Sequence, residues 1–152
     1  MRFKILAVLA LTALVSACAG TTTGGGAGAG AIVPGSQEDL VVNVGDRVFF
    51  GFDKYNLDGN ARSTLEKQAA WLKANSGITI TVEGHADERG TREYNLALGS
   101  RRANAVKDYL IALGISEARV KTISYGKERP VALGSNEAAW AQNRRAVSIV
   151  AN

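Results

Sequence analysis

The chain shows two patterns of hydrophobic and polar residues, and each predicts a different kind of element. Ile78, Ile80 and Val82 alternate with polar residues, which is typical of a strand with one buried face. After a polar turn, apolar residues recur every three or four positions, which predicts an amphipathic helix. Thr91 is the expected N-cap of this helix and Gly114 its left-handed C-terminal stop. The apolar stripe of the helix would contain Leu96, Gly99, Ala103, Val106, Leu110 and Leu113.

The same two patterns recur on either side of this strand and helix. In chain order they predict a strand at 47–52, a helix ending at 75–77 with Leu65, Ala69 and Leu72 on its buried side, a strand at 119–125, a short helix at 136–143 and a strand at 146–150. This β-α-β-α-β-α-β order predicts an α/β (α+β) fold, a two-layer sandwich in which helices pack on one sheet.

A second set of residues lies to one side of the apolar stripe. Asn95, Leu98 and Arg102 share the three-and-four spacing, but at about 100° per residue they fall roughly 60–120° from the centre of the stripe. We therefore expect them at the rim of the helix rather than in the core. Because helical side chains lean toward the N-terminus, Arg102 is expected to point at the preceding loop, which contains Asp87.

A carboxylate and a guanidinium that converge beside the free amides of a helix N-terminus form a site suited to a zwitterion. Asp87 would bind an ammonium group, and Arg102 would bind a carboxylate through a bidentate fork. The amides would attract the anion further. The structural alternative is that Asp87 caps a turn and that Arg102 pairs with Asp87 or Glu88 at the surface, where ion pairs contribute little.

The segment GHADERGTREYNLALGSRRANAVKDYL resembles the core motif of the OmpA-like peptidoglycan-binding domain family. Within that family, the Leu-Gly-x-Arg-Arg-Ala run at Leu98 to Ala103 is similar to the branch of lipoproteins that work with the Tol proteins. Many other members have Ser in place of Gly99. The resemblance extends from about Val48 to Val150 and includes FDKYNL, SYGKERP and NRRAV. It implies a mixed four-stranded sheet rather than a fully parallel one.

The resemblance implies non-covalent binding of the peptidoglycan stem peptide through meso-diaminopimelate. The side-chain end of this amino acid carries an ammonium and a carboxylate on one carbon. The ammonium-binding Asp of the family falls on Asp87 and its carboxylate-binding Arg falls on Arg102. The supporting Asn maps to Asn95, the polar residue after the first strand to Asp53, and the first arginine of NRR to Arg144.

Each supporting residue also has a purely structural alternative. Asp53 would cap its turn, Asn95 would cap or bridge contacts within one helical turn, and Arg144 would be a surface cation ahead of the last strand. Leu98 would be ordinary packing, although at the rim it could also form an apolar wall for the ligand. His85, the only histidine, is expected to end the strand and to form hydrogen bonds within its loop.

Residues 1–17 are expected to be a lipoprotein signal peptide. Arg2 and Lys4 precede an apolar run, Ile5 to Val15, which is too short for an ordinary transmembrane helix. The following Val-Ser-Ala-Cys resembles the bacterial lipobox, which implies that Cys18 carries a diacylglycerol and an N-acyl chain such as palmitate. Several acyl chains anchor firmly, at about 0.8 kcal/mol per buried methylene. The alternative is an ordinary signal peptide that contains a cysteine.

Residues 18–39 are expected to form a flexible linker ahead of a folded domain at 40–152. The segment is glycine-rich and uncharged as far as Gly35, so it has little to bury and a high backbone entropy. With the next few residues it could extend to roughly 80 Å, at about 3.3 Å per residue. Ala19 follows the cysteine where an Asp would resemble an inner-membrane retention signal, which favours the outer membrane.

The composition argues against several classes of function. The formal charge of +4, from 18 basic and 14 acidic residues, becomes +2 (16 minus 14) without Arg2 and Lys4, which is too mild for a nucleic-acid partner. Cys18 is the only cysteine, so an intramolecular disulfide and a Cys-based zinc cluster are excluded. No serine lies in a G-x-S-x-G elbow. We therefore expect no enzyme activity, no metal and no cofactor apart from the lipid on Cys18.

The resemblance further implies a tether, with lipid at one end and cell wall at the other, that joins the outer membrane to peptidoglycan. It implies a partner too, the periplasmic TolB propeller, which would compete for an overlapping surface, together with other Tol components. The expected roles are envelope integrity and constriction of the outer membrane during cell division. The alternative is a flagellar-stator-type anchor behind a transmembrane helix. Cys18 and the absence of another apolar run of about 18 residues argue against it.

Overall fold

The computed structural model describes residues 31–151. The predicted signal peptide, the lipidation site at Cys18 and the linker up to residue 30 lie outside the described residues. The predicted order of strands and long helices is confirmed, and short helical segments are added before β1 and β3. The elements are α1 (Gln37–Asp39), a π-helix (Leu40–Val44), β1 (Arg47–Phe49), α2 (Gly59–Ala74), β2 (Thr79–His85), α3 (Arg92–Ala112), a 3-10 helix (Glu117–Arg119), β3 (Val120–Gly126), α4 (Glu137–Asn143) and β4 (Arg145–Ala151).

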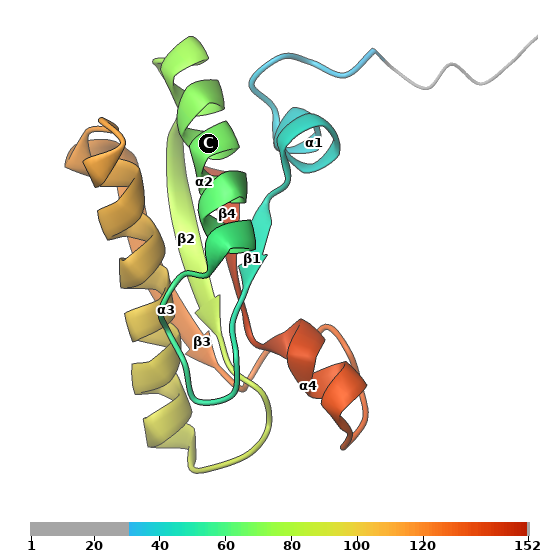
Figure 1. Ribbon diagram of the computed structural model, residues 1–152. Helices are drawn as coiled ribbons and strands as arrows, with labels where there is room; N and C mark the ends of the chain where they lie inside the picture. The colour runs from blue at the N-terminus through green and yellow to red at the C-terminus, as the bar shows by residue number, and fades with distance from the viewer. Residues whose placement is uncertain (1–30, 152) are drawn as a thin grey trace, which may run out of the picture. The chain divides into compact units, whose positions relative to one another are not determined.

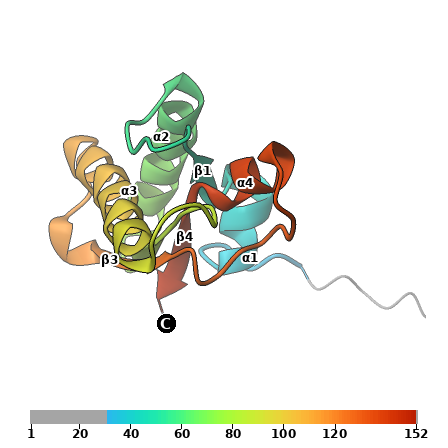
Figure 2. The same cartoon turned by 90° about the horizontal axis from the view of Figure 1, so that it is seen from below.

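Within the described residues, four strands form one mixed sheet in the order β1-β4-β2-β3. β4 runs antiparallel to both of its neighbours, whereas β2 and β3 are parallel. The long helices α2 and α3 lie next to each other on one face of the sheet (Figure 1), and the view from below shows them as a separate layer (Figure 2). The two-layer architecture with a mixed four-stranded sheet is therefore confirmed.

The core lies between this helix layer and the sheet. Leu65, Ala69 and Leu72 of α2 are buried there, as predicted, and so are Ile80 and Val82 of β2. All members of this cluster belong to the segment from β1 to β4, so that segment supplies its own core. Among the helices of residues 31–151, none has the length and apolar character needed to cross a membrane.

Side chains cap the helices at the positions that the sequence indicates. The Thr91 hydroxyl accepts a hydrogen bond from the Tyr94 amide at the start of α3 (3.2 Å), and Gly114 adopts the left-handed conformation after its end (φ +94°). Asp58 and Asn136 cap α2 and α4 in the same way. The caps at Asp58 and Thr91 therefore end the loops that follow β1 and β2, which meet at one end of the sheet (Figure 1).

The folded domain begins earlier than the predicted boundary at residue 40. The Gln37 side chain accepts a hydrogen bond from the Val150 amide (2.7 Å) and donates to the Ser148 carbonyl (3.3 Å). The Asp39 carboxylate accepts from the Trp71 indole (2.8 Å). The Gln37 contacts continue the edge of β4 beyond the short β1, and the Asp39 contact joins α1 to α2, so the expected linker ends before α1. Polar side chains that pair with distant strands leave no periodic signal in the sequence.

Helix α3 approaches β2 very closely at the end where the loops meet. A methyl group on Gly84 would overlap the carbonyl oxygen of Gly99, and a methyl group on Gly99 would overlap the Ser124 hydroxyl. Glycine at both positions therefore places the amino-terminal half of α3 directly on the strand ends, where the candidate site lies.

Candidate functional site

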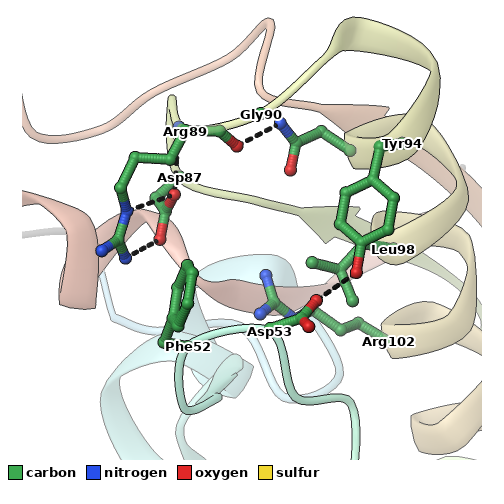
Figure 3. Close-up of a pocket in the computed structure, with 9 residues that line it drawn as sticks. Phe52, Asp53, Asp87, Arg89, Gly90, Tyr94, Leu98 and Arg102 are labelled. Atoms are coloured by element: carbon green, nitrogen blue, oxygen red, sulfur yellow. Dashed lines mark hydrogen bonds and ion pairs between the residues drawn. The ribbon is translucent and has the colours of Figure 1, made fainter.

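The loop after β1, the loop after β2 and the first turns of α3 enclose a hollow of about 190 Å³. The lining residues come from all three segments (Figure 3): Phe52, Asp53, Asp87, Arg89, Gly90, Tyr94, Asn95, Leu98 and Arg102. Every residue predicted to bind peptidoglycan lies in this lining except Arg144. The sequence therefore located the region of the hollow, although not its full composition.

Arg102 is completely buried (0 % exposed), and main-chain carbonyl groups fix its guanidinium. Its Nε donates to the Lys54 carbonyl (2.8 Å), Nη1 to the His85 carbonyl (2.8 Å) and Nη2 to the Gly51 carbonyl (3.2 Å). Because a guanidinium has five N–H donors, two remain for a ligand. Burial lowers the pKa of Arg102 to about 10, so the group is still charged at neutral pH.

The prediction that Asn95, Leu98 and Arg102 lie at the rim of α3 is wrong. They are 2 %, 4 % and 0 % exposed, whereas Leu96, a member of the predicted apolar stripe, is 50 % exposed. The loops after β1 and β2 are hydrogen-bonded to Arg102 and Asn95 and cover this side of the helix. The buried arc of α3 is therefore rotated away from Leu96. This burial also excludes the alternative of Arg102 in a surface ion pair.

Asp87 is buried as well, and both of its carboxylate oxygens accept hydrogen bonds from the protein. Arg89 donates from Nη2 to Oδ2 (2.6 Å) and from Nε to Oδ1 (3.1 Å). Arg144 donates from Nη1 to Oδ2 (3.4 Å). Burial raises the pKa of Asp87, but the hydrogen bonds from Arg89 and Arg144 outweigh it and hold that pKa below its usual range. Asp87 is therefore ionised at neutral pH and already shared between two arginines.

Arg89 is held above Asp87 by stacking as well as by charge. Its guanidinium carbon lies 4.1 Å from the centre of the Phe52 ring and 4.0 Å from that of the Trp140 ring. Both distances fall within the cation–π range. The Asn95 side chain fixes the same loop, since Nδ2 donates to the Arg89 carbonyl (2.8 Å). Asn95 therefore both lines the hollow and holds the loop that carries Asp87.

Asp53 supplies a second carboxylate to the hollow. It adopts a positive φ (56°), which is uncommon for a residue other than glycine. Its Oδ1 accepts a hydrogen bond from the Tyr94 hydroxyl, which comes from the first turn of α3 (Figure 3). Among the hydrogen bonds of residues 31–151, none joins the Asp53 side chain to its own turn, so the capping alternative is not what the structure shows.

Arg144 occupies a different position from the one that the sequence predicted. It is 5 % exposed and lies behind Asp87, where Nε donates to the Phe50 carbonyl (2.9 Å) and Nη2 donates to Glu137 (2.6 Å). It is therefore neither a lining residue nor a surface cation. Its place makes it a positioning residue for Asp87. Leu98, in contrast, forms part of the apolar wall of the hollow.

His85 ends β2 as expected, but the expected hydrogen bonds of its ring are not found. Within the described residues neither ring nitrogen has a hydrogen-bond partner, and the ring stacks on Tyr125 with a centroid distance of 5.6 Å. Burial, assisted by the charges of Arg145 and Arg129, lowers the pKa of His85 to about 4. The imidazole is therefore neutral at pH 7, and only its carbonyl group serves the site, as an acceptor for Arg102.

Four lining residues were missed at the level of sequence: Phe52, Arg89, Gly90 and Tyr94. Tyr94 lies four residues before Leu98 in α3 and so on the same side of the helix, which is a signal that could have indicated it. Phe52 and Arg89 had no such signal. Phe52 and Arg89 contact each other, and Arg89 also contacts Trp140, so both positions depend on residues that are distant in the sequence.

The OmpA family model matches residues 49–144, a range that includes every residue of the hollow. Curated relatives include a peptidoglycan-associated lipoprotein from Rhizobium meliloti (strain 1021), which is 50% identical over 155 residues, with 98% of this chain and 88% of the relative covered. Another, from Agrobacterium fabrum (strain C58 / ATCC 33970), is 57% identical over 123 residues, with 81% of this chain and 70% of the relative covered.

Solved structures show the same fold. The crystal structure of the peptidoglycan-associated lipoprotein from Burkholderia pseudomallei has a TM-score of 0.68 and 46% identity, and the match covers 70% of this chain and 90% of that one. The C-terminal domain of Helicobacter pylori MotB has a TM-score of 0.65 at 20% identity, covering 70% of this chain and 84% of that one. At that identity the likeness to MotB concerns the fold alone.

Proposed function

The chain belongs to the OmpA family, and within it to the peptidoglycan-associated lipoproteins, and from this premise we propose that it binds the meso-diaminopimelate of the peptidoglycan stem peptide. Binding is non-covalent, and the protein acts as a tether rather than as an enzyme. The observation that supports this most directly is that Asp87 and Arg102, buried and of opposite charge, line one hollow.

The chemistry of the hollow matches the side-chain end of diaminopimelate. The two N–H groups of Arg102 that the main chain does not use would donate to the carboxylate of the ligand. Asp87 and Asp53 would accept from its ammonium. At about 190 Å³ the hollow is smaller than the roughly 300–1,000 Å³ of sites for drug-sized ligands, so it suits one end group rather than a whole peptide.

Arg89 has to give way in part when the ligand binds. It now makes the hydrogen bonds to Asp87 that the ammonium would make. Exchanging one cation for another leaves the buried carboxylate paired throughout, which avoids the large cost of an uncompensated charge. Because Phe52 and Trp140 hold Arg89 independently of Asp87, the guanidinium can yield one hydrogen bond and remain in place.

We further propose that the lipid on Cys18 anchors the protein in the outer membrane and that the domain reaches the wall through the linker. In this arrangement the protein belongs to the Tol–Pal system and contributes to envelope integrity and to constriction of the outer membrane during division. Phe52 and Tyr94, 60 % and 45 % exposed, give the mouth of the hollow an aromatic surface. Aromatic residues are enriched in protein interfaces, which fits TolB competing for this surface.

Titration with synthetic stem peptides tests the proposed function. Peptides that contain diaminopimelate should bind more tightly than peptides that contain lysine, because lysine lacks the second carboxylate and leaves buried donors of Arg102 unpaired. The expected difference is about 1–3 kcal/mol, or roughly 5- to 150-fold in affinity. Calorimetry on the purified protein measures both constants. Equal affinities for the two peptides would remove the proposed ligand.

A further inference from the structure

Helix α3 presents a second arginine at the mouth of the hollow. Tyr94, Leu98 and Arg101 are spaced four and three residues apart and so lie on one side of the helix. Tyr94 and Leu98 line the hollow, and Arg101 is the exposed end of the same row. A ligand that leaves the hollow along this side of the helix would therefore pass Arg101.

Two aromatic rings lie beside the guanidinium of Arg101. Its guanidinium carbon lies 5.6 Å from the centre of the Tyr55 ring and 5.8 Å from that of the Tyr94 ring, within the cation–π range. The Tyr94 ring is itself fixed, because its hydroxyl donates to Asp53. A guanidinium that is already ordered loses less conformational entropy when a ligand binds to it.

Arg101 differs from the other cations around the hollow in that neither a salt bridge nor a buried network of carbonyl groups engages its guanidinium in the described residues. Arg89 and Arg144 are both paired with Asp87, and Arg102 is bonded to carbonyl groups inside the protein. The salt bridges found among residues 31–151 do not include Arg101. Its charge is therefore available at the mouth.

We propose that Arg101 binds a second carboxylate of the stem peptide, next to the diaminopimelate end group in the hollow. This inference rests on the proposed function, because it places the first carboxylate at Arg102. Two stem-peptide groups share the required chemistry. D-Glutamate is linked through its side chain, so its α-carboxylate stays free on one side of diaminopimelate, and the terminal D-alanine of a tetrapeptide has a carboxylate on the other. Each is about one residue away, at roughly 3.3–3.6 Å per extended residue.

Amidated peptides distinguish these two sources. A tetrapeptide with both carboxylates free, one amidated at D-glutamate and one amidated at D-alanine would each be titrated into the purified protein. One of the two amidations should weaken binding to the wild type by roughly three- to fivefold, the size of an exposed ion pair. Arg101→Gln should weaken binding of the unmodified peptide by the same factor and should no longer respond to that amidation.

Arg92→Gln is the matched control, since it removes one positive charge from the same helix at a site that pairs with Glu128, outside the hollow. It should retain the response of the wild type to amidation. The response should also fade in 1 M salt, where the screening length is about 3 Å.

The inference about Arg101 is overturned if neither amidation affects the wild type, or if Arg101→Gln responds to amidation as the wild type does. Its failure is distinct from that of the proposed function. If diaminopimelate is preferred over lysine but amidation has no effect, only Arg101 is reassigned. If diaminopimelate and lysine peptides bind equally, the proposed function itself is wrong.

Discussion

Two arginines hold the two ends of β2 in the same way, yet only one of them borders a hollow. Arg102 donates to three main-chain carbonyl groups around the carboxyl end of β2. Arg119 donates to three around its amino end, at distances of 2.7, 2.9 and 2.8 Å. In both cases a guanidinium satisfies carbonyl groups that would otherwise lack a donor where a strand or helix ends.

The surroundings of the two groups differ in burial and charge. Arg119 remains partly exposed, whereas Arg102 is 0 % exposed and has Asp87 and Asp53 beside it in the hollow. Burial lowers the pKa of Arg102 to about 10, which is the signature of a desolvation cost. Arg119 shows that a guanidinium can satisfy the carbonyl groups at the end of a strand without this desolvation cost. The deeper burial of Arg102 therefore supports the proposed role of this residue in ligand binding.

Replacing Arg102 with lysine should have the largest effect. Lysine keeps a positive charge but lacks the planar fork, so it cannot serve three carbonyl groups and a ligand carboxylate together. We expect Arg102→Lys to bind the diaminopimelate peptide on the order of 100-fold more weakly, or about 2.7 kcal/mol. The free energy of unfolding should also fall, by about 1–3 kcal/mol, because buried carbonyl groups lose donors. Calorimetry and urea unfolding measure the two quantities.

Arg119→Lys is the control for this prediction. It also removes a guanidinium from three carbonyl groups, so it should lower the free energy of unfolding by about 1–3 kcal/mol as well. Peptide affinity, measured well below the temperature at which the variant unfolds, should not change. If Arg119→Lys weakened binding as much as Arg102→Lys, the loss at Arg102 would be a general structural effect.

Acid should destabilise the protein through the end of β2 that Arg102 holds, because His85 lies there. His85, whose carbonyl group accepts from Arg102, has its pKa lowered from 6.5 to about 4 by burial and by the charges of Arg145 and Arg129. Between these values the unfolded chain binds a proton that the folded protein does not. The free energy of unfolding should therefore fall from pH 6.5 to pH 4, by roughly 2–3 kcal/mol, and this loss is complete below pH 4.

The groups that face His85 define the control. Glu83 lies 3.5 Å from Nε2, Tyr125 stacks on the ring, and Arg129 and Arg145 supply the positive charge. In His85→Gln, urea midpoints should be nearly constant between pH 6.5 and pH 4. Further loss at lower pH should persist, because carboxyl groups with lowered pKa values then take up protons. A variant with the same pH profile as the wild type would refute the role of His85.

The smallest effect is expected from Asn95→Ala. The Asn95 amide donates to the Arg89 carbonyl and so positions the loop with Asp87. Loss of this one hydrogen bond should weaken peptide binding by about 0.5–1.5 kcal/mol, or roughly 2- to 12-fold. Asn75→Ala removes the equivalent bond near Arg119, where the side-chain amide donates to the Trp71 carbonyl (2.9 Å), and should leave binding unchanged. Equal losses in the two variants would contradict the assignment of Asn95.

Local signals explain why most of the fold could be predicted from sequence. Alternation at Ile80 and Val82 marked β2, and Thr91 and Gly114 marked the ends of α3. Such signals lie within a few residues of the feature that they specify, so one sequence suffices to read them. The family resemblance added the mixed sheet, which periodicity alone does not determine.

The parts that were missed depend on contacts between distant segments. A helical pattern gives the angle between Arg102 and the apolar stripe, but it does not show that loops fold over Arg102 and bury it. In the same way, the sequence placed Arg144 near the site without showing that it lies behind Asp87. Arg89, which donates to the carboxylate of Asp87 that we propose binds the ligand, is fixed by rings from two other segments. The charge and spacing of residues in the sequence identify candidates for the site, whereas their burial in the structure is needed to assign a role to each.

The most direct test of the central claim combines the two changes that should remove the same contact. The affinities of the wild type and of Arg102→Lys would each be measured for a stem peptide with diaminopimelate and for one with lysine. The four values form a double-mutant cycle with one change in the protein and one in the ligand. If the carboxylate of diaminopimelate binds Arg102, the wild type should prefer diaminopimelate by roughly 5- to 150-fold, and this preference should fall to near unity in the variant. A preference of the same size in both proteins would contradict the claim.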